Sequence, residues 1–309
     1  MVDKTPIKII AIIVIPLVIA AIVRFNTLDG KGKSDRKSGK NEQADILDID
    51  KEVGPNVMIS WLLPESLKEV SGIAWVDADH FACIQDELGK VFIFNVRLNK
   101  IDQEIPFGPK GDYEGIAVVA TTIYVLRADG VLFGIENYSD KNRSVKMYTT
   151  LLTKKQDSES LAYDEKNSRL LISVKADDPG SEDYKGIYAF NLKTKTMPVA
   201  PVYKINLKDE IFKDVSKGKG KNKDKDNDVI SPSDMGVHPL NDNIYILEGT
   251  RPKLLIMSRE GKLLSLYELD DTVFSQPEGL TFSPDGKLYI SNEGNKKEGN
   301  ILQVELLNK

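Results

Sequence analysis

The stretch EGIAVVATTIYVLRADGVLFGIENYSDKNRSVKMYTTLL, residues 114–152, decides the fold of this chain. It reads as four short runs rich in aliphatic, β-branched and aromatic residues, at 114–120, 122–128, 130–137 and 144–152, separated by tight turns and one polar loop. Runs of this length and composition, bounded by turn residues, predict β-strands. The stretch therefore predicts one four-stranded antiparallel sheet.

The first residues of this stretch recur along the chain. Five strings share a small or acidic residue, a small or polar residue, an aliphatic residue and a small one: SGIA at Ser71, EGIA at Glu114, ESLA at Glu159, SDMG at Ser233 and EGLT at Glu278. They are 43, 45, 74 and 45 residues apart. The long interval contains the charged, low-complexity segment SKGKGKNKDKDND at 216–228, which predicts a surface insertion at about 210–230. Repeats of this period indicate a propeller.

The last repeat ends at Lys309 after only three strands, while the segment at about 56–62 precedes the first repeat and has no place in it. A strand from the N-terminal side that completes the last sheet closes the ring and removes exposed edges. The sequence thus predicts an all-β, five-bladed β-propeller of four-stranded antiparallel blades over residues 55–309. A β-sandwich is disfavoured, because its strands would not repeat in phase.

Acidic residues gather around the repeated strings. The innermost strand of each blade lines the central channel, so the strings should surround one mouth of the channel. Fifteen residues onward from Ser71, Ser233 and Glu278 lie Asp86, Glu248 and Glu293, with Glu87 next to Asp86, and two residues before Glu159 lies Asp157. The predicted metal ligands are Asp86, Glu114, Glu159, Glu248, Glu278 and Glu293, and the predicted ligand-binding residues are Glu69, Asp112, Arg127, Lys175 and Asp234.

Crowded carboxylates raise one another's pKa unless positive charge lies between them. Calcium is the natural counter-ion, because it takes six to eight oxygen ligands in irregular geometry. Zinc is disfavoured, because the chain has only two histidines, His80 and His238, and one cysteine, Cys83. Two alternatives remain open: the acids fix turns through backbone N–H groups and contact solvent, or they act in catalysis without a metal.

Two other acidic segments deserve comparison with calcium loops. The segment DKDND, 224–228, has acidic residues at alternate positions, as a calcium-binding loop does. However, Val229 stands where such a loop has its turn glycine, and Met235 stands at the twelfth position, where it has a glutamate. ADDPGSED, 176–183, is expected to be a solvated turn, with calcium binding as the alternative. The two histidines are expected to be structural.

The N-terminus has a different composition. IIAIIVIPLVIAAIV, 9–23, contains fifteen uncharged residues and ends at Arg24, which predicts a hydrophobic helix within residues 1–25. It is either an uncleaved signal-anchor, which we favour, or a cleavable signal peptide. Basic residues on both flanks leave the orientation open, and we expect export. Residues 26–54 are polar and lack periodicity, as expected for a flexible tether.

The chain resembles the SdiA-regulated (YjiK-like) family of calcium-linked β-propeller proteins over about residues 55–309. The motifs behind the resemblance are WLLPESLKEVSGIAW from Trp61, ACIQDELGKVFIF from Ala82, GDYEGIAVV from Gly111, YVLRADGVLF from Tyr124, DSESLAYD from Asp157, SPSDMGVHP from Ser231 and PEGLTFSPDGKLYISNEG from Pro277. The resemblance implies a propeller of the cell envelope, similar in design to calcium-dependent phytases and lactonase-type propellers. It leaves enzymatic activity open, and the chain lacks the histidine pair of the lactonase type.

Three functions follow from these features. The first is a membrane-anchored, periplasmic or extracellular module that binds calcium or a similar divalent cation at one mouth of the channel. It would act as a ligand-binding or scaffolding module in calcium homeostasis or signalling, with a small anionic ligand or a protein as further partner. The second is a phytase-like, metal-dependent hydrolase of phosphate esters, in which Arg127 and Lys175 hold the phosphate. The third is a protein-interaction platform that uses residues 216–228. The net charge of −5 gives no indication of a nucleic-acid partner.

Overall fold

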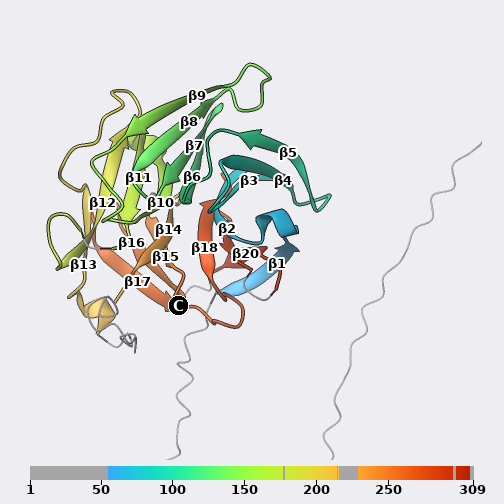
Figure 1. Cartoon of the computed structure of the whole chain (residues 1–309). Helices are drawn as coiled ribbons and strands as arrows, with labels where there is room; N and C mark the ends of the chain where they lie inside the picture. Colours follow the sequence, from blue (N-terminus) through green and yellow to red (C-terminus); the bar gives the residue numbers. More distant parts are fainter. Residues whose placement is uncertain (1–54, 177, 214, 216–228, 295–296, 307–309) are drawn as a thin grey trace, which may run out of the picture. The chain divides into compact units, whose positions relative to one another are not determined.

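The computed structural model describes residues 55–176, 178–213, 215, 229–294 and 297–306. These residues form five four-stranded antiparallel sheets arranged as blades around a central channel (Figure 1). The predicted all-β, five-bladed propeller is therefore confirmed. The predicted hydrophobic helix and tether, and the insertion at 216–228, lie outside the described residues. No helix in the described ranges is long and apolar enough to cross a membrane.

Each blade is a meander whose first strand lies nearest the channel. From the channel outward, blade 1 contains β2 (Val70–Asp77), β3 (His80–Gln85), β4 (Lys90–Asn95) and β5 (Lys100–Pro106); blade 2 contains β6 (Tyr113–Val119), β7 (Thr122–Arg127), β8 (Val131–Glu136) and β9 (Ser144–Thr149); blade 3 contains β10 (Ser158–Asp164), β11 (Arg169–Val174), β12 (Tyr184–Asn191) and β13 (Tyr203–Asn206); blade 4 contains β14 (Pro232–Val237), β15 (Ile244–Glu248), β16 (Lys253–Met257) and β17 (Leu263–Glu268); blade 5 contains β18 (Pro277–Phe282), β19 (Leu288–Asn292), β20 (Asn300–Glu305) and β1 (Asn56–Leu62). Three single 3₁₀ turns, at Glu65–Leu67, Glu165–Asn167 and Glu210–Phe212, complete the described secondary structure.

The outer strand of blade 5 comes from the start of the described chain. β1 pairs antiparallel with β20, with Asn56 opposite Glu305 and Leu62 opposite Asn300 (Figure 1). Trp61 of β1 also packs near Tyr289 of β19, with their ring centroids 6.3 Å apart. Strands from the two ends of the described chain thus share one sheet.

The hydrophobic core is divided among the blade interfaces. Five clusters of buried aliphatic and aromatic side chains lie between blades 1 and 2, 2 and 3, 3 and 4, 4 and 5, and 5 and 1. Since each blade has two core-facing sides, its inner strands are apolar at most positions rather than alternating. The inner strands also approach closely, because a Cβ on Gly115 would lie 2.7 Å from Leu161 Cβ of the next blade. This contact explains why small residues recur in the strings.

Candidate functional site

Every inner strand contains a β-bulge at the first residue of its repeated string. In blade 2, Tyr113 lies opposite Arg127 and Gly115 opposite Leu126, so Glu114 is the extra residue. The register shifts in the same way in the other four blades. The bulged residues are Ser71, Glu114, Glu159, Ser233 and Glu278. A bulge redirects a side chain, and here it brings three glutamates to one end of the channel.

The three glutamates interact with one another and with one lysine. Glu159 Oε1 accepts a hydrogen bond from Lys175 Nζ at 3.0 Å, and Glu159 is only 4% exposed. Burial and the charge of Glu159 raise the pKa of Glu114 far above its usual range. Burial raises the pKa of Glu159 as well, against the opposing effect of Lys175. Burial raises the pKa of Glu278 to about 7.

Lys175 is the cation among these acids. Burial lowers its pKa, but Glu159, Glu278 and Glu114 outweigh this effect, so the net pKa is raised. Lys175 therefore stays protonated at neutral pH. Among the described residues one ammonium faces three glutamates, and repulsion between the acids adds to the larger effect of burial in raising their pKa values.

Further predicted acids lie beside this cluster. Burial, and then the charges of Asp86 and Glu69, raise the pKa of Glu293. Burial and Glu69 raise the pKa of Asp86, with Asp112 contributing. The structure thus brings eight of the predicted residues into one acidic mouth: Glu69, Asp86, Asp112, Glu114, Glu159, Lys175, Glu278 and Glu293.

The structure does not bring Glu248 into the acidic mouth. Its carboxylate is fully buried, 2.9 Å from Arg251 Nε and 3.0 Å from Lys253 Nζ. Pro232 lies opposite Glu248, whereas in blade 1 Val70 lies opposite Gln85. The β14–β15 hairpin is thus one residue longer, and successive side chains of a strand point to opposite faces. A fixed step of fifteen residues therefore reaches the wrong face in blade 4.

The residue of blade 4 that faces the mouth is Gly249. A Cβ at Gly249 would lie 2.6 Å from Glu278 Oε1 and 2.9 Å from the carbonyl oxygen of Pro277. Glycine at this position therefore leaves room for the Glu278 carboxylate. Spacing in the sequence does not reveal Gly249, because its place in the mouth depends on the register of the β14–β15 hairpin.

Arg127 also lies on the face away from the mouth. Its Nε and Nη2 atoms each lie 2.8 Å from the carboxylate of Asp129, and its guanidinium carbon lies 5.6 Å from the centroid of the Phe133 ring. Arg127 faces Tyr113 across the β6–β7 pair, in the register position that Gln85 and Glu248 occupy in their blades. The predicted anion-binding pair of Arg127 and Lys175 is therefore not brought together.

Asp234 lies deeper in the channel, one residue beyond the bulge of β14. It is 3% exposed, and its Oδ2 accepts a hydrogen bond from the backbone N–H of Leu280 at 2.6 Å. Its Oδ1 has no hydrogen-bond partner within the described part of the chain. Burial raises the pKa of Asp234 well above its ordinary value, although nearby backbone N–H groups oppose this.

The two serines at bulged positions have a structural role. Ser71 Oγ donates a hydrogen bond to the carbonyl oxygen of Tyr113 at 2.7 Å, and Ser233 Oγ donates one to that of Pro277 at 2.9 Å. Each serine thus ties its blade to the residue directly before the glutamate of another blade. The repeated strings alone do not predict this role, because the acceptor carbonyls belong to other blades.

The remaining candidates are held by structural contacts. His80 lies between Asp77 and Asp102, at 2.8 and 3.1 Å. His238 packs against Tyr245 and Phe282. In the ADDPGSED segment, Asp178 accepts hydrogen bonds from the backbone of Gly180 and from the hydroxyl of Tyr188 in β12, so its carboxylate is held by contacts within blade 3. DKDND lies outside the described residues.

The donor set of the acidic mouth is suited to a hard cation. All its anionic groups are carboxylates, the ligand type that calcium prefers, and it contains neither histidine nor cysteine. Within the described ranges, however, no three His, Cys, Asp or Glu side chains are already arranged to hold a metal ion. A cation would therefore require the side chains of the mouth to rearrange around it.

Comparisons with known proteins identify the fold. No family model and no curated protein sequence matches the chain. Among solved structures, glutaminyl cyclase from Myxococcus xanthus aligns with a TM-score of 0.54 and 13% identity, over 81% of this chain and 95% of that chain. Virginiamycin B lyase from Staphylococcus aureus aligns with a TM-score of 0.43 and 13% identity, over 75% and 66%. The alignment with glutaminyl cyclase supports the β-propeller fold, and none of these findings extends to the SdiA-regulated family.

Proposed function

We propose that this propeller is a ligand-binding module that takes up calcium or a similar divalent cation at the acidic mouth of its channel. The observation that carries the proposal is the convergence of Glu114, Glu159 and Glu278, at equivalent bulged positions of three blades, around the single ammonium of Lys175. The buried Asp234, with one carboxylate oxygen unpartnered in the described structure, adds an acceptor beneath them.

In this proposal the glutamates provide the oxygen ligands and Lys175 competes with the cation. The Lys175 side chain is 35% exposed and flexible, so its ammonium can turn toward solvent when a cation takes its place. A divalent ion that displaces the ammonium would supply two positive charges where Lys175 supplies one. The acids further out, Asp86, Glu69 and Glu293, would attract cations to the mouth.

The geometry gives less support to a phosphate-ester hydrolase. That alternative needs a cationic pair to hold a phosphate, and Arg127 is instead committed to Asp129 and Phe133. The dense negative charge of the mouth would also repel a phosphate unless several cations were bound first. We extend the proposal to a membrane-anchored module of the cell envelope because of the apolar segment at 9–23.

The test is a calcium titration of the purified protein by calorimetry and thermal unfolding. We expect calcium to bind and to raise the melting temperature, and the double variant Glu114→Gln, Glu159→Gln to lose both effects. Glu260→Gln, which neutralises an exposed acid in a turn, is the control and should behave as the parent does. Absence of binding by calcium, manganese and magnesium in the parent protein would overturn the proposal.

A further inference from the structure

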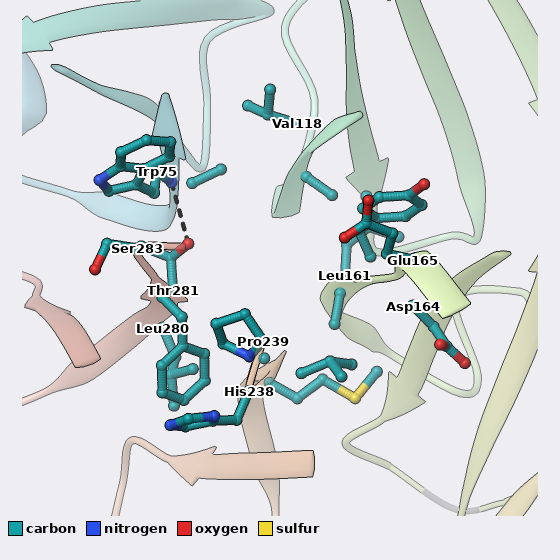
Figure 2. A pocket seen from close by; sticks show the side chains of 18 of the residues that line it. Trp75, Val118, Leu161, Asp164, Glu165, His238, Pro239, Leu280, Thr281 and Ser283 are labelled. Carbon is teal, nitrogen blue, oxygen red and sulfur yellow. Dashed lines mark hydrogen bonds between the residues drawn. The ribbon is translucent and has the colours of Figure 1, made fainter. Parts of the chain in front are cut away.

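The far end of the channel contains a pocket of about 570 Å³. It lies where the inner strands end, and the loops after β10, β14 and β18 contribute to its wall. Its volume is within the range of about 300–1,000 Å³ that is usual for small-molecule sites. Figure 2 shows side chains from several blades around the open space.

The fivefold repeat gives this pocket an apolar floor and an apolar rim. Residues two positions beyond each bulge form the floor, and all are at most 4% exposed: Ile73, Ile116, Leu161, Met235 and Leu280. Residues four positions beyond each bulge form the half-buried rim: Trp75, Val118, Tyr163, Val237 and Phe282. Along each inner strand, the floor lies between the pocket and the acidic mouth. The pocket is thus a separate site.

Apart from Glu165, the charged groups at the pocket are held in ion pairs, in which Asp164 binds two arginines. Asp164 lies 2.7 Å from Arg169 and 2.5 Å from Arg259. Lys166 and Asp242 pair with each other at 2.8 Å.

Besides the phenol of Tyr163, two titratable side chains remain at the pocket. Burial lowers the pKa of His238, so its imidazole is neutral near pH 7. Glu165 is exposed at the edge of the pocket, and no ion-pair partner for it occurs within the described residues (Figure 2). In the described ranges, Glu165 therefore places one carboxylate without an ion-pair partner beside an apolar interior.

We propose that this pocket binds a hydrophobic molecule that carries one ammonium group. The apolar body would lie on the floor and against Trp75 and Phe282, whose burial provides most of the affinity. The ammonium would lie near the Glu165 carboxylate and over the neighbouring Tyr163 ring, where cation–π attraction adds to the ion pair. An anionic ligand with the same body would be repelled by Glu165.

The test uses three probes with one apolar body: 4-phenylbutylamine, 4-phenylbutanol and 4-phenylbutanoate. In a Trp61→Phe variant, Trp75 is the only tryptophan and reports on the rim. For ligands of this size we expect dissociation constants on the order of 1 mM. The amine should bind about two- to fivefold more tightly than the alcohol at low ionic strength, and the acid should bind more weakly than both.

Two variants distinguish the effect of the Glu165 charge from the effect of the shape of the pocket. Glu165→Gln should abolish the preference for the amine and leave the affinity for the alcohol unchanged, while Glu182→Gln, an exposed acid in the loop after β11, should retain the preference. Val118→Phe fills the rim and should weaken all three probes. The proposal is overturned if no probe changes Trp75 fluorescence or releases heat, if the acid binds as well as the amine, or if Glu165→Gln keeps the preference.

Discussion

Lys175 Nζ lies 3.0 Å from Glu159 Oε1, and both residues reach the acidic mouth from blade 3. Glu159 is the bulged residue of β10, and Lys175 directly follows the end of β11. The other blades place Asp86, Ala128, Gly249 and Glu293 at the position of Lys175. Blade 3 alone supplies a cation there, so the mouth has an internal counter-ion that any bound cation must displace.

Removal of this counter-ion should strengthen cation binding. Lys175→Met keeps the length of the apolar stem and removes the competing charge, so the calcium affinity should rise by about tenfold or more. Calorimetric titration measures this change. Lys208→Met, at an exposed lysine paired with Asp183, is the control and should leave the affinity unchanged. Weaker binding in Lys175→Met would mean that Lys175 supports the site.

Stability without divalent cations should fall as the pH rises. The pKa of Glu278 is raised to about 7 from an ordinary 4.5, so the folded state binds more protons than the unfolded state between these values. The free energy of unfolding should therefore decrease between about pH 5 and pH 8, with roughly 2–3 kcal/mol from Glu278 and a further decrease from Glu114 and Glu159, whose pKa values are also raised. Denaturant unfolding at several pH values measures this slope. Glu278→Gln should make the slope shallower without abolishing it, because Glu114 and Glu159 still contribute, and an unchanged slope in that variant would contradict the assignment.

Gly249→Ala should impair the mouth through Glu278. The new Cβ would lie 2.6 Å from Glu278 Oε1 and 2.9 Å from a backbone oxygen, so the carboxylate must move. We expect a loss of about 1–3 kcal/mol in unfolding free energy and weaker calcium binding. Thr250→Ala changes the exposed neighbour and should affect neither quantity. If calcium binds Gly249→Ala as it binds the parent, Glu278 is not a ligand.

Glu248→Gln distinguishes a structural acid from a ligand. The variant leaves Arg251 and Lys253 without their buried carboxylate partner, which should cost about 3–5 kcal/mol of unfolding free energy. Calcium affinity, measured at a temperature where the variant is folded, should stay unchanged because Glu248 points away from the mouth. A selective loss of calcium binding without destabilisation would return Glu248 to the ligand set.

Ser71→Ala and Ser233→Ala should each weaken the contact between blades. Each variant removes one buried hydrogen bond to a backbone carbonyl, at a cost of about 1 kcal/mol or more, because the carbonyl loses a partner. Chemical denaturation measures the loss. Ser66→Ala, at an exposed serine, is the matched control. Equal stability of all three variants would show that these bonds contribute nothing.

The repeated strings predicted the blades because apolar periodicity and turn residues are local properties of the chain. They also predicted that Glu114, Glu159 and Glu278 share one end of the channel, since equivalent positions of a rotational repeat lie around one axis. The prediction of site residues was wrong at positions whose direction depends on the register of a β-hairpin. A single extra residue in β14–β15 turns Glu248 to the opposite face and places Gly249 in the mouth. The pairing of Arg127 with Asp129 could not be anticipated from spacing alone.

By itself, the sequence determined the number of blades, the strands of each blade and the concentration of acids at the strand starts. Only the tertiary structure decided which acids meet, because each β-bulge shifts the alternation of side chains and the distance between blades depends on their packing. It also decided that Lys175 is the cation at the mouth and that apolar residues line the opposite end of the channel. These relations join residues from different blades, and no local pattern of the chain records them.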